Sequence, residues 1–171
     1  MYTKKSKVFP IIITILIIVI IIYLFATIKQ TEISCNKSNV DDLGIKVVEE
    51  LKANLDGRSI KSMVVEKTIV LPDEYLYAKD SVEFLLKKSY EYLDEDKVSF
   101  SSLNNKLIIR IEINKDETII LNNIEFSEDE GLQVKINSNT KSSDVITLKV
   151  GDNYTEGELM TRMKNNGYVC K

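Results

Sequence analysis

The chain has 171 residues, which fits one domain with room for an appended segment. It contains neither histidine nor tryptophan. The missing histidine excludes Ser-His-Asp and Cys-His catalysis, histidine-ligated zinc and imidazole-based switching. The formal net charge of −3 argues against a nucleic-acid-binding protein, which needs a basic face. The mean hydropathy of −0.08 is typical of a soluble protein, but it averages two very different parts of the chain.

The N-terminal part predicts a membrane anchor. Residues 8–28 contain no charged side chain. A helix of this length spans about 31 Å, which matches one hydrocarbon core. Lys7 and Lys29 bracket the segment, and their side chains can extend to the two interfaces. Three lysines lie among residues 1–7, so the positive-inside rule places this tip in the cytoplasm and the rest of the chain outside.

Other interpretations of the apolar segment fit less well than a permanent anchor. A cleaved signal peptide has a shorter apolar core and ends in a small-x-small site, whereas this segment is long and is followed by Lys-Gln-Thr-Glu. Secretion after cleavage stays open as an alternative. A lipoprotein needs an apolar residue three positions before its cysteine. In this chain the residue three positions before Cys35 is Glu32, which is charged. We therefore expect a single-pass protein of the cell membrane.

Residues 29–171 form the predicted extracytoplasmic part, which has a net charge of −6. Residues 29–42 are polar with little periodicity and predict a stalk. The remaining residues, 43–171, are numerous enough to bury a single core without help.

Apolar residues alternate on both sides of Asp56-Gly57, which is a strong turn signal. Before the turn, with Glu49 interrupting the apolar pattern, they are Ile45, Val47, Leu51, Ala53 and Leu55. After the turn they are Met63, Val65, Ile69 and Leu71. The pattern predicts a long β-hairpin. A helix over residues 41–55 is an alternative, because apolar residues there also fit a 3.6-residue period.

The next element is a predicted helix over residues 80–93. Asp80 and Glu83 resemble a capping box at its start. The apolar residues that follow have helical spacing, namely Val82, Leu85, Leu86, Tyr90 and Leu93. Alternating patterns then predict strands over residues 98–102, 107–113, 118–126, 132–136 and 146–150.

The C-terminal part predicts one more helix and a last short strand. Thr155 and Glu158 form a second capping box, and Gly167 is a natural helix stop. Residues 168–170 then return to an extended pattern. The order of elements predicts an α+β fold, with an antiparallel sheet covered on one face by about two helices.

The two cysteines, Cys35 and Cys170, lie near the two ends of the predicted extracytoplasmic part, where thiols can oxidise. We expect a structural disulfide between them, with two unpaired thiols as the alternative. A catalytic thiol is disfavoured because the chain has no histidine to activate one.

Taken together, several features resemble small membrane-anchored or lipoprotein-like ectodomain proteins of low-GC bacteria. They are the lysine-rich start, the isoleucine-rich anchor, Cys35, the turn at Asp56-Gly57-Arg58 and the ending Asn166-Gly167-Tyr168-Val169-Cys170-Lys171. Only the two cysteine ends are specific. The resemblance implies an extracytoplasmic α+β domain and supplies no catalytic residues.

Few residues suggest a functional site. The acidic clusters at 94–96 and 128–130 lack the spacing of an EF-hand loop, so we interpret them as solvated turns. Tyr75 and Tyr77 flank the connection into the first helix and are the candidate binding surface for a glycan or peptide. The sequence predicts no catalytic, cofactor-binding or metal-ligating residue.

These observations favour a binding or interaction module at the cell envelope. Its expected partners are the lipid bilayer and an envelope protein or cell-wall component, with no nucleic acid. The alternative is an envelope hydrolase that uses carboxylates alone. A deep pocket that holds two carboxylates would favour this second hypothesis.

Overall fold

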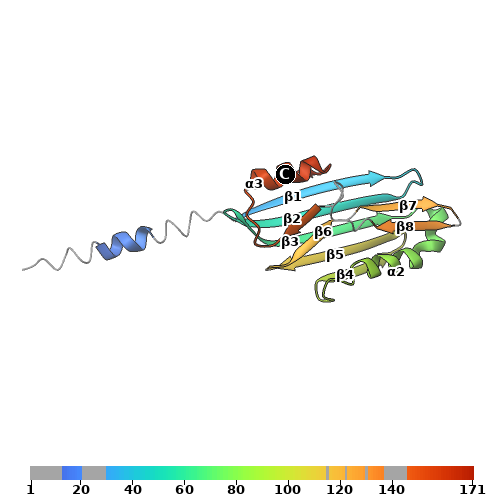
Figure 1. Cartoon of the computed structure of the whole chain (residues 1–171), viewed down its shortest axis with the longest axis horizontal. Coiled ribbons are helices and arrows are strands. Elements are labelled where there is room, and N and C mark those ends of the chain that lie inside the picture. The colour runs from blue at the N-terminus through green and yellow to red at the C-terminus, as the bar shows by residue number, and fades with distance from the viewer. Residues whose placement is uncertain (1–12, 21–29, 115, 122, 130, 137–145) are drawn as a thin grey trace, which may run out of the picture. The chain divides into compact units, whose positions relative to one another are not determined.

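The computed structural model describes residues 13–20, 30–114, 116–121, 123–129, 131–136 and 146–171 (Figure 1). The chain divides into two compact units, Met1–Gln30 and Thr31–Lys171. In the first unit, residues 13–20 are helical. Among the described residues, no helix is long and apolar enough to span a bilayer. Most of the predicted anchor, residues 8–28, lies outside the described residues, so the anchor stays a prediction.

The second unit is an α+β domain, as the sequence predicts. Its strands are β1 (Gln30–Val40), β2 (Lys46–Asp56), β3 (Ser59–Val70), β4 (Val98–Leu103), β5 (Lys106–Asn114), β6 (Thr118–Leu121), β7 (Ile124–Glu128), β8 (Leu132–Ile136), β9 (Ile146–Lys149) and β10 (Val169–Cys170). Its helices are the 3₁₀ helix η1 (Asp73–Ala78), α2 (Lys79–Ser89) and α3 (Glu156–Asn165).

A six-stranded sheet organises the domain, with strand order β10-β1-β2-β3-β5-β4 (Figure 1). The pairs β2–β3, β3–β5, β4–β5 and β1–β10 are antiparallel. The β2–β3 hairpin confirms the predicted turn at Asp56-Gly57, where Gly57 has a φ of +64° that favours glycine. The alternative helix over residues 41–55 is wrong, because residues 46–55 lie in β2.

One face of this sheet is buried, and a bulge keeps the hairpin in phase with it. The register between β2 and β3 shifts between Asn54 and Leu55, so Ile60 and Met63 both point to the buried face. On β5 the buried residues are Leu107, Ile109, Ile111 and Ile113. This alternation gives one apolar face and one polar face to each strand.

Helices and two small sheets complete the core. The pairs β6–β9 and β7–β8 form separate two-stranded antiparallel sheets. Helix α2 buries Val82 and Leu86, and α3 buries Leu159 and Met163. The predicted second capping box is confirmed, because Thr155 Oγ1 accepts from the Glu158 backbone N–H at 3.2 Å.

Three details of the predicted elements are wrong. The helix predicted over residues 80–93 ends at Ser89, and it follows directly from η1, so Asp80 does not cap it. The strand predicted over residues 118–126 is divided into β6 and β7. The segment predicted as a stalk, residues 29–42, instead contains β1, which lies inside the sheet. Its two buried side chains, Ile33 and Cys35, are too few to produce a clear alternating pattern in a polar segment.

Candidate functional site

The predicted tyrosine surface exists only in part. Tyr77 is exposed, with 69% of its surface accessible, whereas Tyr75 is 6% exposed. The Tyr75 hydroxyl donates to Glu128 Oε2 at 2.8 Å, and this hydrogen bond raises the pKa of Tyr75 to about 12. Tyr75 is therefore a structural residue that joins η1 to β7, and the prediction of its exposure is wrong. The rings of Tyr75 and Tyr77 lie 6.5 Å apart.

The first acidic cluster, Asp94-Glu95-Asp96, lies in a turn, as predicted. Lys97 binds both Asp94, at 2.9 Å, and Glu117, which precedes β6. The hydrogen bond from Lys97 lowers the pKa of Asp94. Within the described ranges no group of three or more acidic or cysteine side chains has the arrangement of a metal site.

A buried ion pair lies on the apolar face of the sheet. Glu49 on β2 and Lys67 on β3 are direct cross-strand partners, and Lys67 Nζ lies 2.5 Å from Glu49 Oε2. Lys67 is 1% exposed and Glu49 is 7% exposed. Burial opposes the charge of Lys67, but the attraction of Glu49 outweighs it and raises the lysine pKa. Lys67 is therefore charged inside the core at neutral pH, beside the Glu49 carboxyl group.

Two tyrosines extend this pair into a network. The Tyr168 hydroxyl donates to Glu49 Oε1, and burial next to this carboxylate raises the pKa of Tyr168. The buried hydroxyl of Tyr90 also contributes to the raised pKa of Lys67, although within the described residues it makes no hydrogen bond. The network therefore connects β2, β3, the end of α2 and the residue before β10. A buried charge pair of this kind is stable only when such hydrogen bonds satisfy it.

The network forms one wall of a cavity of about 530 Å³, which we call the amide pocket. Glu49 and Tyr168 line it, together with a second carboxylate, Glu125. Four side-chain amides line it as well, those of Asn39, Asn123, Asn165 and Asn166. Its apolar lining comes from Val47, Leu121, Ile124 and Ile146. The volume is typical of a small-molecule site, but most of the residues that line this pocket are polar, whereas such sites are usually lined mainly by apolar side chains.

The turn after α3 positions Tyr168 in this wall. Gly167 has a φ of +85°, a left-handed conformation that stops the helix at its predicted position. The Tyr168 backbone N–H donates to Met163 O at 3.1 Å, which fixes the chain as it leaves α3. Lys37 on β1 lies over the Tyr168 ring, with Nζ 5.6 Å from the ring centre. The ring is therefore covered, and its hydroxyl points to Glu49.

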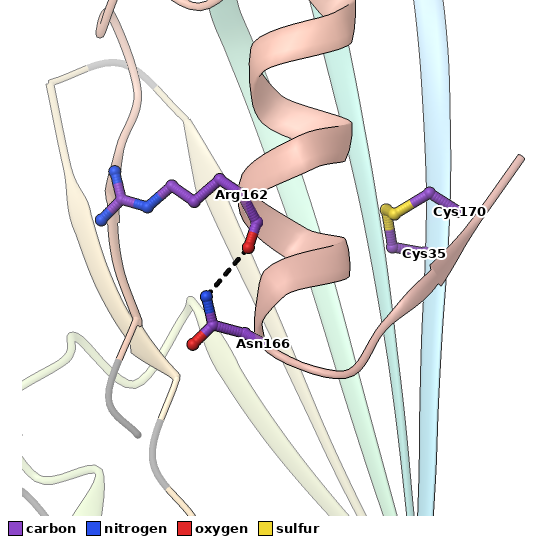
Figure 2. The surroundings of a disulfide bond; sticks show 4 residues. All are labelled: Cys35, Arg162, Asn166 and Cys170. Carbon is purple, nitrogen blue, oxygen red and sulfur yellow. Dashed lines mark hydrogen bonds between the residues drawn. A yellow bond between two sulfur atoms is a disulfide. The ribbon is translucent and has the colours of Figure 1, made fainter. Parts of the chain in front are cut away.

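The predicted disulfide is present next to this turn. Cys35 and Cys170 are bonded with a Cα–Cα distance of 4.0 Å, and they are register partners of β1 and β10 (Figure 2). Lys171 adds two backbone hydrogen bonds to Ser34, at 2.9 and 3.3 Å. In the same region, Asn166 donates its side-chain amide to Arg162 O at 2.9 Å (Figure 2). The disulfide thus holds the short strand that follows Tyr168 against the main sheet.

The amide pocket was not predicted from the sequence. The sequence did contain one signal of the buried pair. Apolar residues alternate along β2 and β3, and Glu49 and Lys67 occupy positions that this alternation directs into the core. Two opposite charges in phase with the core of one hairpin indicate a buried pair. The amides gave no signal, because separate segments bring them together only in the folded domain.

Comparison with known proteins found no matching family model, no matching curated protein and no matching solved structure. Function is therefore argued from the site, because a fold class alone supports many activities. The chemistry of the amide pocket is the most specific feature available for that argument.

Proposed function

We propose that this protein is a single-pass, membrane-anchored binding module whose extracytoplasmic domain holds an uncharged, hydroxyl- and amide-bearing component of the cell envelope. The observation that carries the proposal is the amide pocket. Its anchor is residues 8–28, with residues 1–7 in the cytoplasm. The charge-free length of this segment and the lysines before it support that topology.

The disulfide supports an extracytoplasmic domain. Disulfides persist in oxidising compartments and are rare in the cytosol. The bond between Cys35 and Cys170 closes almost the whole domain, with a sequence separation of 135. Both ends of the domain are thus joined, which suits a domain that begins immediately after a membrane anchor.

The lining of the pocket supports an uncharged polar ligand. An asparagine amide carries two N–H donors and an acceptor oxygen, which pair with hydroxyl and amide groups of a ligand, although Asn166 already donates one N–H to Arg162 O. The carboxylate of Glu49 in this lining is paired with the buried Lys67, and the other charged side chains of the lining are Lys37 and Glu125, so neither sign of charge dominates. The four aliphatic side chains provide an apolar surface of the kind against which a sugar ring packs. An N-acetylated oligosaccharide of the cell wall has all of these properties.

The arrangement of the carboxylates favours binding over hydrolysis. The pocket holds two carboxylates, Glu49 and Glu125, as the hydrolase hypothesis requires. However, Glu49 accepts from Lys67 and from Tyr168 with its two oxygens. A glycosidase needs one carboxylic acid that donates a proton to the leaving group. Both oxygens of Glu49 already accept from Lys67 and Tyr168, so Glu49 is unsuited to that role and to the role of the second carboxylate, which attacks the sugar or activates a water.

The proposed binding is tested with full-length protein in detergent and a neutral N-acetylglucosamine tetramer as the probe, by isothermal titration calorimetry. The double variant Asn39→Ala, Asn123→Ala removes two pocket amides. Each lost hydrogen bond is worth about 0.5–1.5 kcal/mol, so we expect affinity to fall about tenfold. The control Asn54→Ala removes an amide on β2 that bonds Ser62 away from the pocket, and should bind as wild type. No saturable binding, or equal affinity in both variants, would contradict the proposal.

A separate experiment tests the anchor and its topology. Protease added to intact cells should degrade a tag placed after Lys171 and leave a tag before Met1 protected. The membrane fraction should also contain chains with an intact N-terminus. Chains that begin after residue 28 and appear in the medium would support the secreted alternative instead.

A further inference from the structure

The disulfide joins two segments that line the amide pocket. Lys37 and Asn39 follow Cys35 at two-residue intervals, so the three side chains share one face of β1. Tyr168 precedes Cys170 by two positions, and it lines the pocket together with Lys37 and Asn39. The bond therefore lies at the end of both runs of pocket residues, one on β1 and one after α3 (Figure 2).

The sheet holds these two segments with very different strength. Strand β1 has 11 residues and lies between β10 and β2 in the sheet. Strand β10 has 2 residues, is an edge of the sheet, and exposes 63% of Val169. It pairs with β1 at Cys35 and Asn36, and the following Lys171 exchanges two backbone hydrogen bonds with Ser34. Exposed backbone hydrogen bonds open easily, so the disulfide is the strongest of these restraints on β10.

Opening of β10 would reach Tyr168, because only Val169 separates this tyrosine from the bonded Cys170. The Tyr168 hydroxyl donates to Glu49, and its ring lies under Lys37, with the ammonium 5.6 Å from the ring centre. Both contacts require the ring to stay in one position. If the segment after α3 moves outward, Glu49 loses this donor and water enters the pocket wall beside the carboxylate.

We propose that the bond between Cys35 and Cys170 is a redox switch of the amide pocket, and that its reduction lowers the affinity for the ligand. This inference rests on the ligand binding proposed above. In the oxidised domain the wall at Tyr168 is already ordered when the ligand arrives. In the reduced domain the ligand has to order that wall, which weakens binding. Strand β1 and helix α3 keep their places in both forms, so the reduced domain stays folded.

The reductant is a dithiol, either a small molecule or the paired thiols of a protein. Cys170 is the accessible partner, because it is half-buried on the edge strand whereas Cys35 is fully buried. One thiolate of the dithiol attacks Cys170 Sγ, the S–S bond breaks, and Cys35 leaves as a thiolate and takes up a proton. The second thiolate then attacks the dithiol's own sulfur in the mixed disulfide, and Cys170 leaves and is protonated. Two electrons and two protons pass to the protein, and the dithiol becomes a disulfide.

Hydrogen exchange of full-length protein in detergent tests the release of the wall without any ligand. After reduction with dithiothreitol, we expect the amides of Tyr168 and Lys171 to exchange at least tenfold faster, while β5 (Lys106–Asn114) keeps its rates. The control variant Cys35→Ala, Cys170→Ala should exchange like the reduced protein and not respond to dithiothreitol. Unchanged rates at Tyr168 and Lys171 would overturn the inference. Equal acceleration in β5 would overturn it too, because reduction would then unfold the whole domain.

Calorimetry with the N-acetylglucosamine tetramer tests the switch itself. We expect the reduced protein to bind the tetramer about tenfold more weakly than the oxidised protein. Linkage then requires the tetramer, when it saturates both forms, to favour the disulfide by the same factor. A tenfold factor lowers the reduction potential of this two-electron couple by about 30 mV, measured by equilibration in dithiothreitol redox buffers with and without the tetramer.

The two kinds of failure are distinguishable. Equal affinity of the oxidised and reduced proteins, with no change of potential, would overturn the switch and leave the proposed function intact. Absence of tetramer binding to the oxidised protein would contradict the proposed function, and the switch with it, whatever the exchange rates of the wall.

Discussion

Replacing Glu49 with glutamine removes the negative charge of the buried pair. Glutamine has the shape of glutamate, and its carbonyl oxygen can still accept from the Tyr168 hydroxyl. The substitution therefore preserves the shape of the amide pocket wall, but the acceptor oxygen beside Lys67 is replaced by an N–H donor together with the loss of charge. Because Lys67 is 1% exposed, the lysine cannot reach water without a rearrangement of the sheet.

The expected loss of stability follows from this burial. Removing one partner of a buried ion pair costs about 3–5 kcal/mol, because an uncompensated charge is left in the core. A domain is stabilised by about 5–15 kcal/mol in total, so the variant should still fold but with a much lower urea midpoint. The matched control is Glu50→Gln, the exposed neighbour on the same strand, which should change stability by less than about 0.5 kcal/mol.

The pH dependence of unfolding gives a second signature with a definite sign. In wild type, Glu49 holds the pKa of Lys67 above its unfolded value of about 10.4. The contribution of the charged lysine to folding stability is therefore complete below about pH 10.4, and it is lost as the pH rises from there through the higher folded pKa. In the variant, burial is no longer opposed and the folded pKa falls below 10.4. The variant should therefore gain stability relative to the control as pH rises from 7 toward 10, by up to about 1.4 kcal/mol per pH unit.

Urea unfolding of residues 31–171, followed by circular dichroism at several pH values, measures both effects. Adding Lys67→Met to Glu49→Gln should recover at least about 2 kcal/mol, because apolar replacements of buried pairs are often neutral or stabilising. If the Glu49→Gln variant were as stable as Glu50→Gln, with the same pH slope, the buried pair would not be a charged pair and the reasoning would be wrong.

Three other predictions concern single contacts. Replacing Cys35 and Cys170 with serine should reduce stability by about 5 kcal/mol on the chain-entropy model, seen as a lower urea midpoint that a reductant no longer changes. Tyr75→Phe should remove one tyrosine from the absorbance transition near pH 12, since its bond to Glu128 raises its pKa. Thr155→Ala should cost about 1 kcal/mol, with α3 showing faster hydrogen exchange at its N-terminus.

Local sequence signals predicted much of this fold because they act over short distances. The turn at Asp56-Gly57 fixes the β2–β3 hairpin, and the capping box at Thr155 fixes the start of α3. The cysteine pair was predictable from its position alone. In each case the interacting residues are either close in sequence or chemically unique.

The errors have a common physical cause, which is stabilisation by distant contacts. Strand β1 is polar and resembles a stalk, but it is held by β2 and by β10, to which a disulfide joins it across a sequence separation of 135. Tyr75 lies in a polar connection, and it is buried because Glu128 on β7 accepts its hydroxyl. Neither partner can be inferred from the sequence around the residue itself.

The bulge in the hairpin decides which residue Glu49 meets. Asp56 pairs with Ser59 across the turn, and that register alone would place Glu49 opposite Glu66, with two like charges in contact. The shift between Asn54 and Leu55 accommodates one extra residue on β3, Lys61, and places Glu49 opposite Lys67 instead. The turn was predictable from the sequence and the bulge was not, so the sequence alone could not identify this pair.

Two deletions of an exposed lysine test this role of the bulge. Deleting Lys61 removes the extra residue, so the hairpin becomes regular and Glu49 still faces Lys67. Deleting Lys52 from β2 instead moves Glu49 opposite Glu66, and a one-residue slip also turns the apolar side chains beyond the deletion outward. Loss of the buried partner alone costs about 3–5 kcal/mol, so the Lys52 deletion should unfold at a much lower urea concentration than the Lys61 deletion. Equal midpoints would mean that the pairing of Glu49 with Lys67 does not depend on this register.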